Sequence, residues 1–143
     1  MPIDIIIKQT GMADVTVKLK KAVDKMSDLT PAMKRASALM LGSVNQNFQQ
    51  SGRPAPWRPL SPAYLKRKVA QGYSAKPLIK TGLLRASIAQ KVSTKGFRVG
   101  TSVPYARYHQ LGTGTIPARR FLVFQKQDIE TINQVVIDHL KGE

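Results

Sequence analysis

The chain has 143 residues, a length typical of one domain that can bury a single hydrophobic core. It contains no cysteine, which excludes disulfides, thiolate metal sites and cysteine nucleophiles and indicates a reducing, cytosolic origin. Its 23 lysines and arginines against 8 acidic residues give a net charge of +15, so we expect an anionic partner. The apolar runs are too short to cross a bilayer, and we expect no membrane contact.

The first third of the chain predicts one strand and two helices. The isoleucine-rich stretch 3–8 predicts a short strand. Residues 12–26 have apolar positions at helical spacing, although a local alternation there also suits a strand. Thr30 and Pro31 predict the start of a long helix, with Thr30 as the capping residue, and its apolar face continues to Phe48. We expect the two helices to form a hairpin packed on a sheet.

Residues 52–64 form a proline-rich connector that also carries Trp57, the only tryptophan. Proline fixes φ and removes a backbone donor, so neither a helix nor a central strand is expected here. We expect Trp57 and Leu60 to hold the loop against its own domain; the alternative places Trp57 at a contact between subunits. The basic side chains that this arrangement would leave free for a partner are Arg53, Arg58, Lys66, Arg67 and Lys68.

The second half of the chain predicts short helices, antiparallel strands and a final helix. The predicted elements are a helix at 63–71 opened by Ser61 and Pro62, a one-turn helix or bend at 81–85, a hairpin of strands 86–93 and 97–100, a helix at 104–111, a strand at 120–124, and a helix at 125–140 with Ile129, Ile132, Val136 and Leu140 on one side. Strands kept apart from helices indicate one α+β domain over residues 1–143. We expect a small antiparallel sheet packed against an N-terminal helical hairpin and a C-terminal helix, with an irregular proline-rich centre.

No arrangement of residues predicts catalysis or cofactor binding. A metal site needs converging ligands, whereas His109 and His139 lie on different predicted elements and neither has a ligand at the right spacing. The glycine-containing stretch 112–115 lacks the sequence ending and the strand-to-helix context of a phosphate loop. We therefore expect no catalytic residues, no metal and no cofactor. A basic nucleic-acid-binding accessory protein is the alternative, because lysines and arginines neutralise phosphates.

Several side chains are candidates for contacts with partners or with other subunits. Tyr105, Tyr108 and His109 share one helix face, which either packs on the sheet or meets another subunit. Arg119 and Arg120 precede a predicted strand, so only one of them points inward, onto a carboxylate or a group of backbone carbonyls. The full set of candidate contact residues is Arg53, Trp57, Arg58, Tyr64, Lys66, Arg67, Lys68, Tyr105, Tyr108, His109, Arg119 and Arg120.

Four segments of the chain, taken in order, resemble one family of proteins. The first is Phe48, Gly52-Arg53, Pro56-Trp57-Arg58-Pro59-Leu60-Ser61, Tyr64 and Lys68, and the second is Leu78, Thr81-Gly82-Leu83-Leu84 and Ser87-Ile88. The third is Val99-Gly100-Thr101, Tyr105-Ala106, His109-Gln110 and Gly112, and the fourth is Pro117-Ala118-Arg119-Arg120-Phe121-Leu122. In this order and spacing they resemble the tailed-phage virion morphogenesis family, which includes tail completion proteins of Mu-like and P2-like phages and prophages.

The resemblance implies a non-enzymatic structural protein, assembled in the bacterial host cytoplasm and located in the virion at the head–tail junction. It implies a homo-oligomeric ring, expected to be a hexamer, that contacts the neck or connector and the tail tube or terminator proteins. In such a ring a charge of +15 per copy repels itself. We therefore expect an anionic neighbour, an acidic face of an adjoining ring in preference to DNA, with non-specific DNA contact as the other option.

Overall fold

The computed structural model describes residues 3–8 and 26–142. The described elements, in chain order, are β1 (Ile3–Lys8), α3 (Thr30–Gln49), α4 (Pro62–Ala70), α5 (Leu83–Ala86), β2 (Ala89–Val92), β3 (Gly96–Thr101), α6 (Ala106–Leu111) and α7 (Lys126–Lys141). Helices packed against an antiparallel sheet make this the predicted α+β fold. The predicted helix at 12–26 lies outside the described residues apart from Met26, so the helical hairpin stays a prediction. Among the described helices, none is long and apolar enough to cross a membrane.

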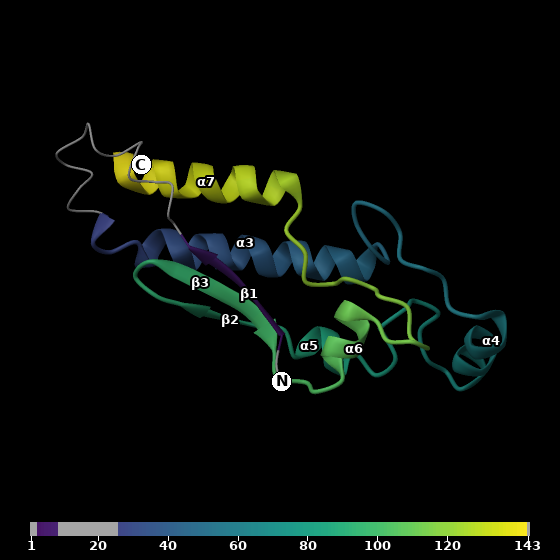
Figure 1. Ribbon diagram of the computed structural model, residues 1–143. Helices are drawn as coiled ribbons and strands as arrows, with labels where there is room; N and C mark the ends of the chain where they lie inside the picture. Colours follow the sequence, from purple (N-terminus) through teal and green to yellow (C-terminus); the bar gives the residue numbers. More distant parts are fainter. Residues whose placement is uncertain (1–2, 9–25, 143) are drawn as a thin grey trace.

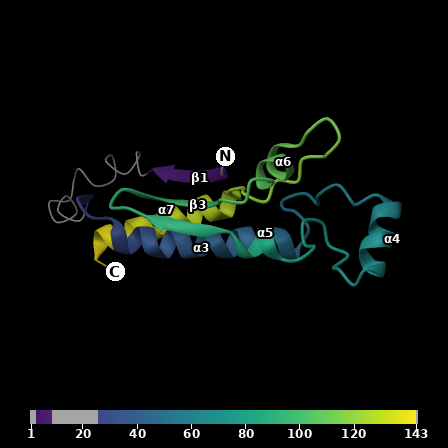
Figure 2. The same cartoon turned by 90° about the horizontal axis from the view of Figure 1, so that it is seen from below.

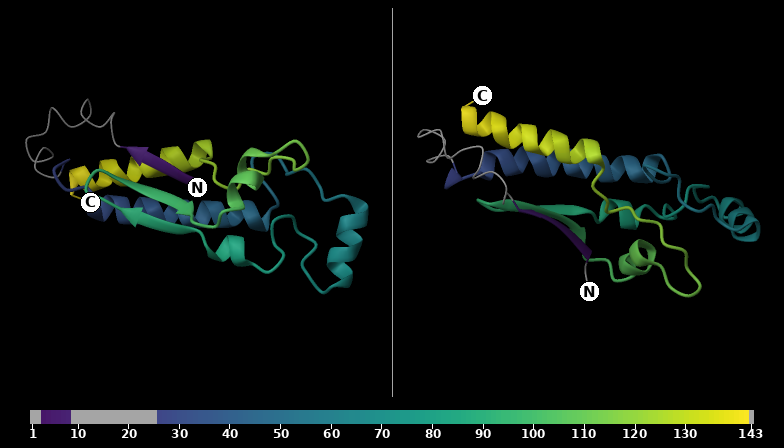
Figure 3. Two further views of the ribbon diagram at one scale, coloured as in Figure 1. Left: turned by 60° about the horizontal axis from the view of Figure 1, so that its bottom comes forward. Right: turned by 45° about the horizontal axis from the view of Figure 1, so that its top comes forward.

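Helix α3 is the centre of the molecule. The three strands lie in the order β1-β3-β2, and both pairings are antiparallel, with Val99 of β3 between Ile5 of β1 and Gln90 of β2. The sheet packs on one side of α3, and α7 runs antiparallel to α3 on the other side (Figures 1 and 3). This half of the molecule therefore has three layers: sheet, α3 and α7.

The buried faces of α3 and α7 explain this layering. On α3 the predicted apolar face is confirmed: Met33, Met40, Val44 and Phe48 are all buried, because residues three or four apart lie on one side of a helix. They pack in one core with the buried apolar residues of the other elements, which include Phe97, Val99, Phe121, Leu122, Ile132, Val136 and Leu140.

The predicted apolar face of α7 is wrong at one position. Ile132 and Val136 are buried as expected, but Ile129 is 49% exposed. The buried residues of α7 are four positions apart, and the same spacing leads to the half-buried Asp128, whose Oδ2 accepts a hydrogen bond from Ser43 Oγ of α3 at 2.6 Å. The first turn of α7 therefore meets α3 through a polar contact, and Ile129 faces solvent.

The start of α3 also differs from the prediction. Thr30 is the first helical residue and not the cap, since the N-cap position belongs to Leu29. The capping side chain is Asp28, whose Oδ1 accepts from the Thr30 amide at 3.0 Å. Hydrogen bonding with Thr30 lowers the pKa of the Asp28 carboxyl. At α4, by contrast, Ser61 is the N-cap as predicted and accepts from the amide of Tyr64.

The predicted strand at 120–124 does not form. Side-chain amides bind its backbone where a neighbouring strand would have done so: Asn47 Nδ2 donates to the Phe121 carbonyl at 2.8 Å, and Gln110 Nε2 donates to the Leu122 carbonyl at 2.8 Å. Because buried backbone groups need partners of any kind and not a ladder in particular, the segment stays extended without joining the sheet. The first hairpin strand is also shorter than predicted, since Ala86 ends α5 and β2 begins at Ala89.

Beyond the end of the sheet, the short helices α4, α5 and α6 and their connecting loops form the second half of the molecule (Figure 2). The chain leaves the C-terminal end of α3 through the proline-rich loop, reaches α4 at the far end of the molecule, and returns to α5 (Figure 1). Irregular backbone dominates this half. Its shape therefore depends on side-chain contacts, which also build the candidate site.

Candidate functional site

Trp57 fixes the proline-rich loop to its own domain, as the first interpretation predicted. Its side chain is only 9% exposed and meets Phe48 edge to face, with ring centroids 5.9 Å apart. The indole Nε1 donates to the carbonyl of Arg120 at 3.0 Å, which joins the loop to a segment 63 residues further along the chain. Leu60 is only partly buried, so Trp57 is the main anchor.

Arg53 is a second anchor, which corrects the expectation that it is free for a partner. Its guanidinium donates from Nε to Asn47 Oδ1 at 2.8 Å, from Nη1 to Gln46 Oε1 at 2.8 Å, and from Nη2 to the Ser43 carbonyl at 2.7 Å. These acceptors all lie on the last turns of α3. The Arg53 carbonyl in turn accepts from Gln125 Nε2 at 3.0 Å, so this residue ties the loop to α3 and to the start of α7.

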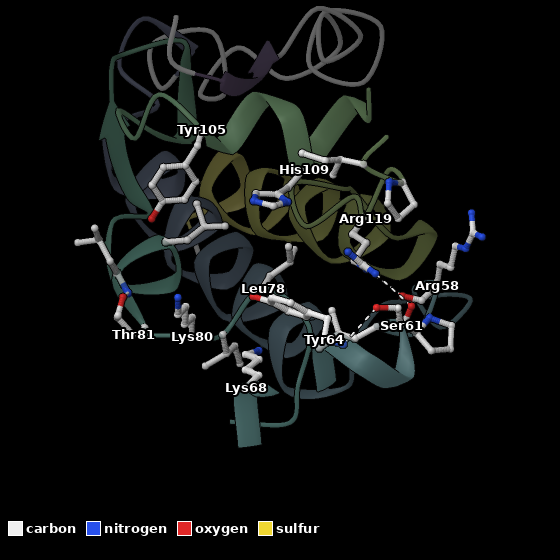
Figure 4. A pocket seen from close by; sticks show the side chains of 18 of the residues that line it. Arg58, Ser61, Tyr64, Lys68, Leu78, Lys80, Thr81, Tyr105, His109 and Arg119 are labelled. Carbon is white, nitrogen blue, oxygen red and sulfur yellow. Dashed lines mark hydrogen bonds between the residues drawn. The ribbon is translucent and has the colours of Figure 1, made fainter. Parts of the chain in front are cut away.

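With the loop fixed, four segments surround an open groove of about 780 Å³ (Figure 4). They are parts of 58–68, 78–84 and 115–119 together with two side chains of the α6 region. Parts of all four segments that carried the family resemblance therefore line one site. Of the candidate contact residues, the groove brings together Arg58, Tyr64, Lys68, Tyr105, His109 and Arg119.

Lys68 is a buried wall residue of this groove and not an exposed member of a basic cluster. Only 3% of its surface is exposed, and Nζ donates to the carbonyl of Lys76 at 2.6 Å. Burial lowers the pKa of Lys68, and the nearby cations Arg119 and Lys80 lower it further. Its neighbours Lys66 and Arg67 are exposed on α4, where Arg67 lies 5.9 Å from the Tyr64 ring, and they do not line the groove.

Arg119 is the second buried cation of the groove, and its partners are backbone carbonyls. It is 7% exposed; Nε donates to the Arg58 carbonyl at 2.8 Å and Nη2 to the Pro59 carbonyl at 3.2 Å (Figure 4). Of the two acceptors considered from the sequence, the carbonyl group is confirmed. Arg120 is exposed, as expected for adjacent extended residues. Burial and the charge of Arg58 lower the pKa of Arg119.

His109 and Tyr105 line the groove from the side of α6. Their rings meet edge to face with centroids 6.1 Å apart, while Tyr108 is 48% exposed and does not line the groove. The Nδ1 atom of His109 is buried and has no hydrogen-bond partner among the described residues. Burial, with a smaller effect of Arg119, lowers the pKa of His109, so the neutral imidazole is favoured.

Sequence reasoning missed other residues of the groove, including Lys80, Leu83 and Ile116. Lys80 and Leu83 flank or belong to the Thr81-Gly82 segment of the resemblance, so that segment was the available signal. The candidate contact residues that lie outside the groove are Arg53, Trp57, Lys66, Arg67, Tyr108 and Arg120.

The basic residues around the groove have no acidic residues near them in the sequence. Residues 29–127 contain no aspartate or glutamate, and the acidic residues all lie in the two terminal segments. The groove residues accordingly include Arg58, Lys68, Lys80 and Arg119 but no carboxylate. Among the described residues there is also no group of three or more His, Asp or Glu side chains that could hold a metal ion. The arrangement is suited to binding an anionic group.

Comparisons with known proteins agree with the resemblance. The model of the phage virion morphogenesis family matches residues 11–141. The chain is 32% identical to the "Mu-like prophage FluMu G protein 2" of Haemophilus influenzae, over 94% of this chain and 95% of that protein. It is also 35% identical to an uncharacterized protein of Methanocaldococcus jannaschii, over 58% of this chain and 67% of the other. No solved structure matches this chain.

Proposed function

The chain belongs to the phage virion morphogenesis family, and from that premise we propose that it acts in tail completion and head–tail joining as a non-enzymatic structural protein. In this role it is part of the virion at the head–tail junction. It works as a homo-oligomeric ring that contacts the neck or connector on one side and the tail on the other. The near full-length similarity to a Mu-like prophage protein supports a role in virion assembly.

The observation that carries the proposal is the convergence of the family-like segments on one groove. The first and last of these segments are joined to each other by the hydrogen bonds of Trp57 and Arg119, and Arg53 fixes the first to α3. Such precise positioning of loops is typical of a surface that binds something. The cationic lining, without an acid, favours an anionic neighbour, as expected for a basic ring beside an acidic one.

Deleting the gene from a phage or inducible prophage that carries it tests this proposal. We expect electron microscopy of the lysate to show filled heads and finished tails that are not joined, and a copy of the gene supplied in trans to restore complete particles. Normal virions in the deletion strain would contradict the proposal. Light scattering of the purified protein, alone and with purified tails, tests the ring; a monomer under both conditions would argue against it.

A nucleic-acid-binding accessory role is the second candidate, favoured by the absence of acidic residues between positions 29 and 127. Exposed basic side chains such as Lys66, Arg67 and Arg120 would neutralise phosphates, so affinity for DNA would fall steeply as salt rises. Tight DNA binding by a protein whose loss leaves head–tail joining intact would favour this candidate over the first.

A further inference from the structure

The two buried cations of the groove have no carboxylate partner among the described residues. Lys68 and Arg119 are both buried, yet their hydrogen bonds go to uncharged backbone carbonyl oxygens. A buried charge is costly unless it is paired, and carbonyl dipoles compensate only part of that cost. The bonds of Arg119 use Nε and Nη2, so among the described residues Nη1 is not engaged in a hydrogen bond. An incoming carboxylate would complete the site.

Apolar side chains line the groove together with these cations. Leu60, Leu78 and Ile79 line the groove and are partly buried, while Leu83 is 57% exposed at its edge. The aromatic rings of Tyr64 and Tyr105, 38% and 40% exposed, add further apolar surface (Figure 4). A ligand that fills this groove therefore needs apolar groups beside its negative charge, because an ion alone would leave these surfaces in water.

Two local features are consistent with a binding site. His109 lines the groove, and its buried Nδ1 has no hydrogen-bond partner among the described residues. Leu78, another lining residue, has φ of 62°, a left-handed conformation that is strained for a leucine and that is concentrated at functional sites.

We propose that this groove binds an acidic segment of a partner protein, a stretch of chain in which carboxylate side chains alternate with apolar ones. The carboxylates pair with Lys80, Arg58 and the inner cations Lys68 and Arg119, and the apolar side chains cover Leu78 and Leu83. That the partner is a neighbouring virion protein rests on the proposed function; the binding chemistry does not.

The shape of the site favours such a segment over duplex DNA. Lys68 and Arg119 are buried in the groove walls, whereas DNA-binding proteins place flexible, exposed cations along the phosphate backbone. A volume of about 780 Å³ is in the range of sites that enclose a few side chains. A duplex is too wide to enter it, so its phosphates would meet only the cations at the edge.

Binding of defined probes to the purified full chain tests the proposal. The probes are a fluorescein-labelled peptide of Glu, Leu and Ser residues, a matched peptide with Gln in place of every Glu, and a labelled double-stranded DNA oligonucleotide. We expect the acidic peptide to bind at least about ten-fold more tightly than the Gln peptide in fluorescence anisotropy, since ten-fold corresponds to about 1.4 kcal/mol and a close charge pair contributes that much.

Matched substitutions locate the binding. Lys80→Glu at the groove is compared with Lys95→Glu in the β2–β3 turn, since both lysines are exposed and the change of charge is equal. Leu83→Ser is compared with Ile129→Ser on α7, since these side chains are 57% and 49% exposed. We expect each groove variant to weaken acidic-peptide binding about ten-fold and each control less than about two-fold, with thermal unfolding confirming that all four fold.

Three outcomes would overturn the proposal: equal binding of the two peptides or none at all, equal effects of Lys80→Glu and Lys95→Glu, or tighter binding of the oligonucleotide with the same dependence on Lys80. These results are distinguishable from a failure of the proposed function. If deletion of the gene leaves virions normal while the acidic peptide still binds at the groove, the assembly role is wrong and the site stands.

Discussion

The side-chain amide of Gln110 pairs with both backbone groups of Leu122: Nε2 donates to the carbonyl at 2.8 Å, and Oε1 accepts from the amide at 3.0 Å. The same Oε1 also accepts from the amide of Phe121 at 3.1 Å. One side chain of α6 thus substitutes for a neighbouring strand, and it holds the segment that carries Arg119.

We therefore predict that Gln110→Leu lowers the free energy of unfolding by about 2 to 4 kcal/mol, because buried backbone groups of Phe121 and Leu122 lose their partners. Urea denaturation measures the loss. The control is Gln127→Leu on the exposed side of α7, for which we expect a change within about 0.5 kcal/mol. Equal stability of the two variants would show that water satisfies these groups in place of Gln110.

Arg53→Lys is expected to destabilise the protein although it keeps the charge. A lysine has one nitrogen and cannot reach Asn47, Gln46 and Ser43 together as the guanidinium does. We expect a loss of about 1 to 3 kcal/mol in the free energy of unfolding. Arg58→Lys, at an exposed side chain of the same loop, is the control and should leave the melting temperature nearly unchanged. The hypothesis of an anchoring role fails if both changes have the same effect.

Gly52→Ala tests how tightly the proline-rich loop folds back on itself. Gly52 has φ of 111°, and an added Cβ would lie 2.5 Å from the backbone nitrogen of Trp57, a contact that forces the loop to move. Gly72 also has a positive φ, 84°, but a Cβ added there would have no atom within 4 Å. Gly72→Ala therefore meets only the conformational penalty of about 1 kcal/mol. We expect Gly52→Ala to cost at least about 2 kcal/mol more than Gly72→Ala in thermal or urea unfolding. Similar costs would indicate that the loop adapts freely.

Stability should depend on pH through His109. The pKa of His109 is lower in the folded state than its ordinary value of 6.5 in the unfolded chain. As the pH falls below 6.5, the unfolded chain therefore binds more protons than the folded protein, and this protonation favours unfolding. The contribution of His109 to stability is therefore full above pH 6.5 and falls as the pH drops from 6.5 toward the folded-state pKa. We expect the free energy of unfolding to fall more between pH 7.5 and 5 for the wild type than for His109→Gln.

An NMR titration of the His109 ring provides the direct measurement, with an expected pKa below 6.5. An equal pH dependence of the wild type and the His109→Gln variant, or a titration at or above 6.5, would contradict this account.

The regular part of the fold was predictable because its signal is periodic. The apolar face of α3 from Met33 to Phe48 and the Ser61 cap of α4 follow from local rules, and the structure confirms them. The absence of a strand at 120–124 could not be predicted in this way. The backbone of this segment pairs with the side chains of Asn47 and Gln110, which lie far away in the sequence. No local pattern reveals such partners.

The candidate site divides in the same way. Half of the candidate residues line the groove, since the segments that carry them could be recognised from the sequence. The orientation of each basic side chain could not be read from the sequence: Arg53 and Lys68 turn inward, while Lys66 and Arg67 on the same stretch face solvent. Burial of a cation depends on which carbonyls come within reach, and that is a property of the completed fold.

The groove depends on contacts between residues that lie far apart in the sequence. Its walls are joined by bonds between residues about 60 positions apart, such as Arg119 to the Arg58 carbonyl and Trp57 to the Arg120 carbonyl. Contacts of such large sequence separation are costly to form early in folding. The exposed lysines and arginines are present on every copy of the chain, finished or not, whereas the groove is present only on copies that have folded to the end. A partner that recognises the groove would therefore accept mature subunits and pass over immature ones.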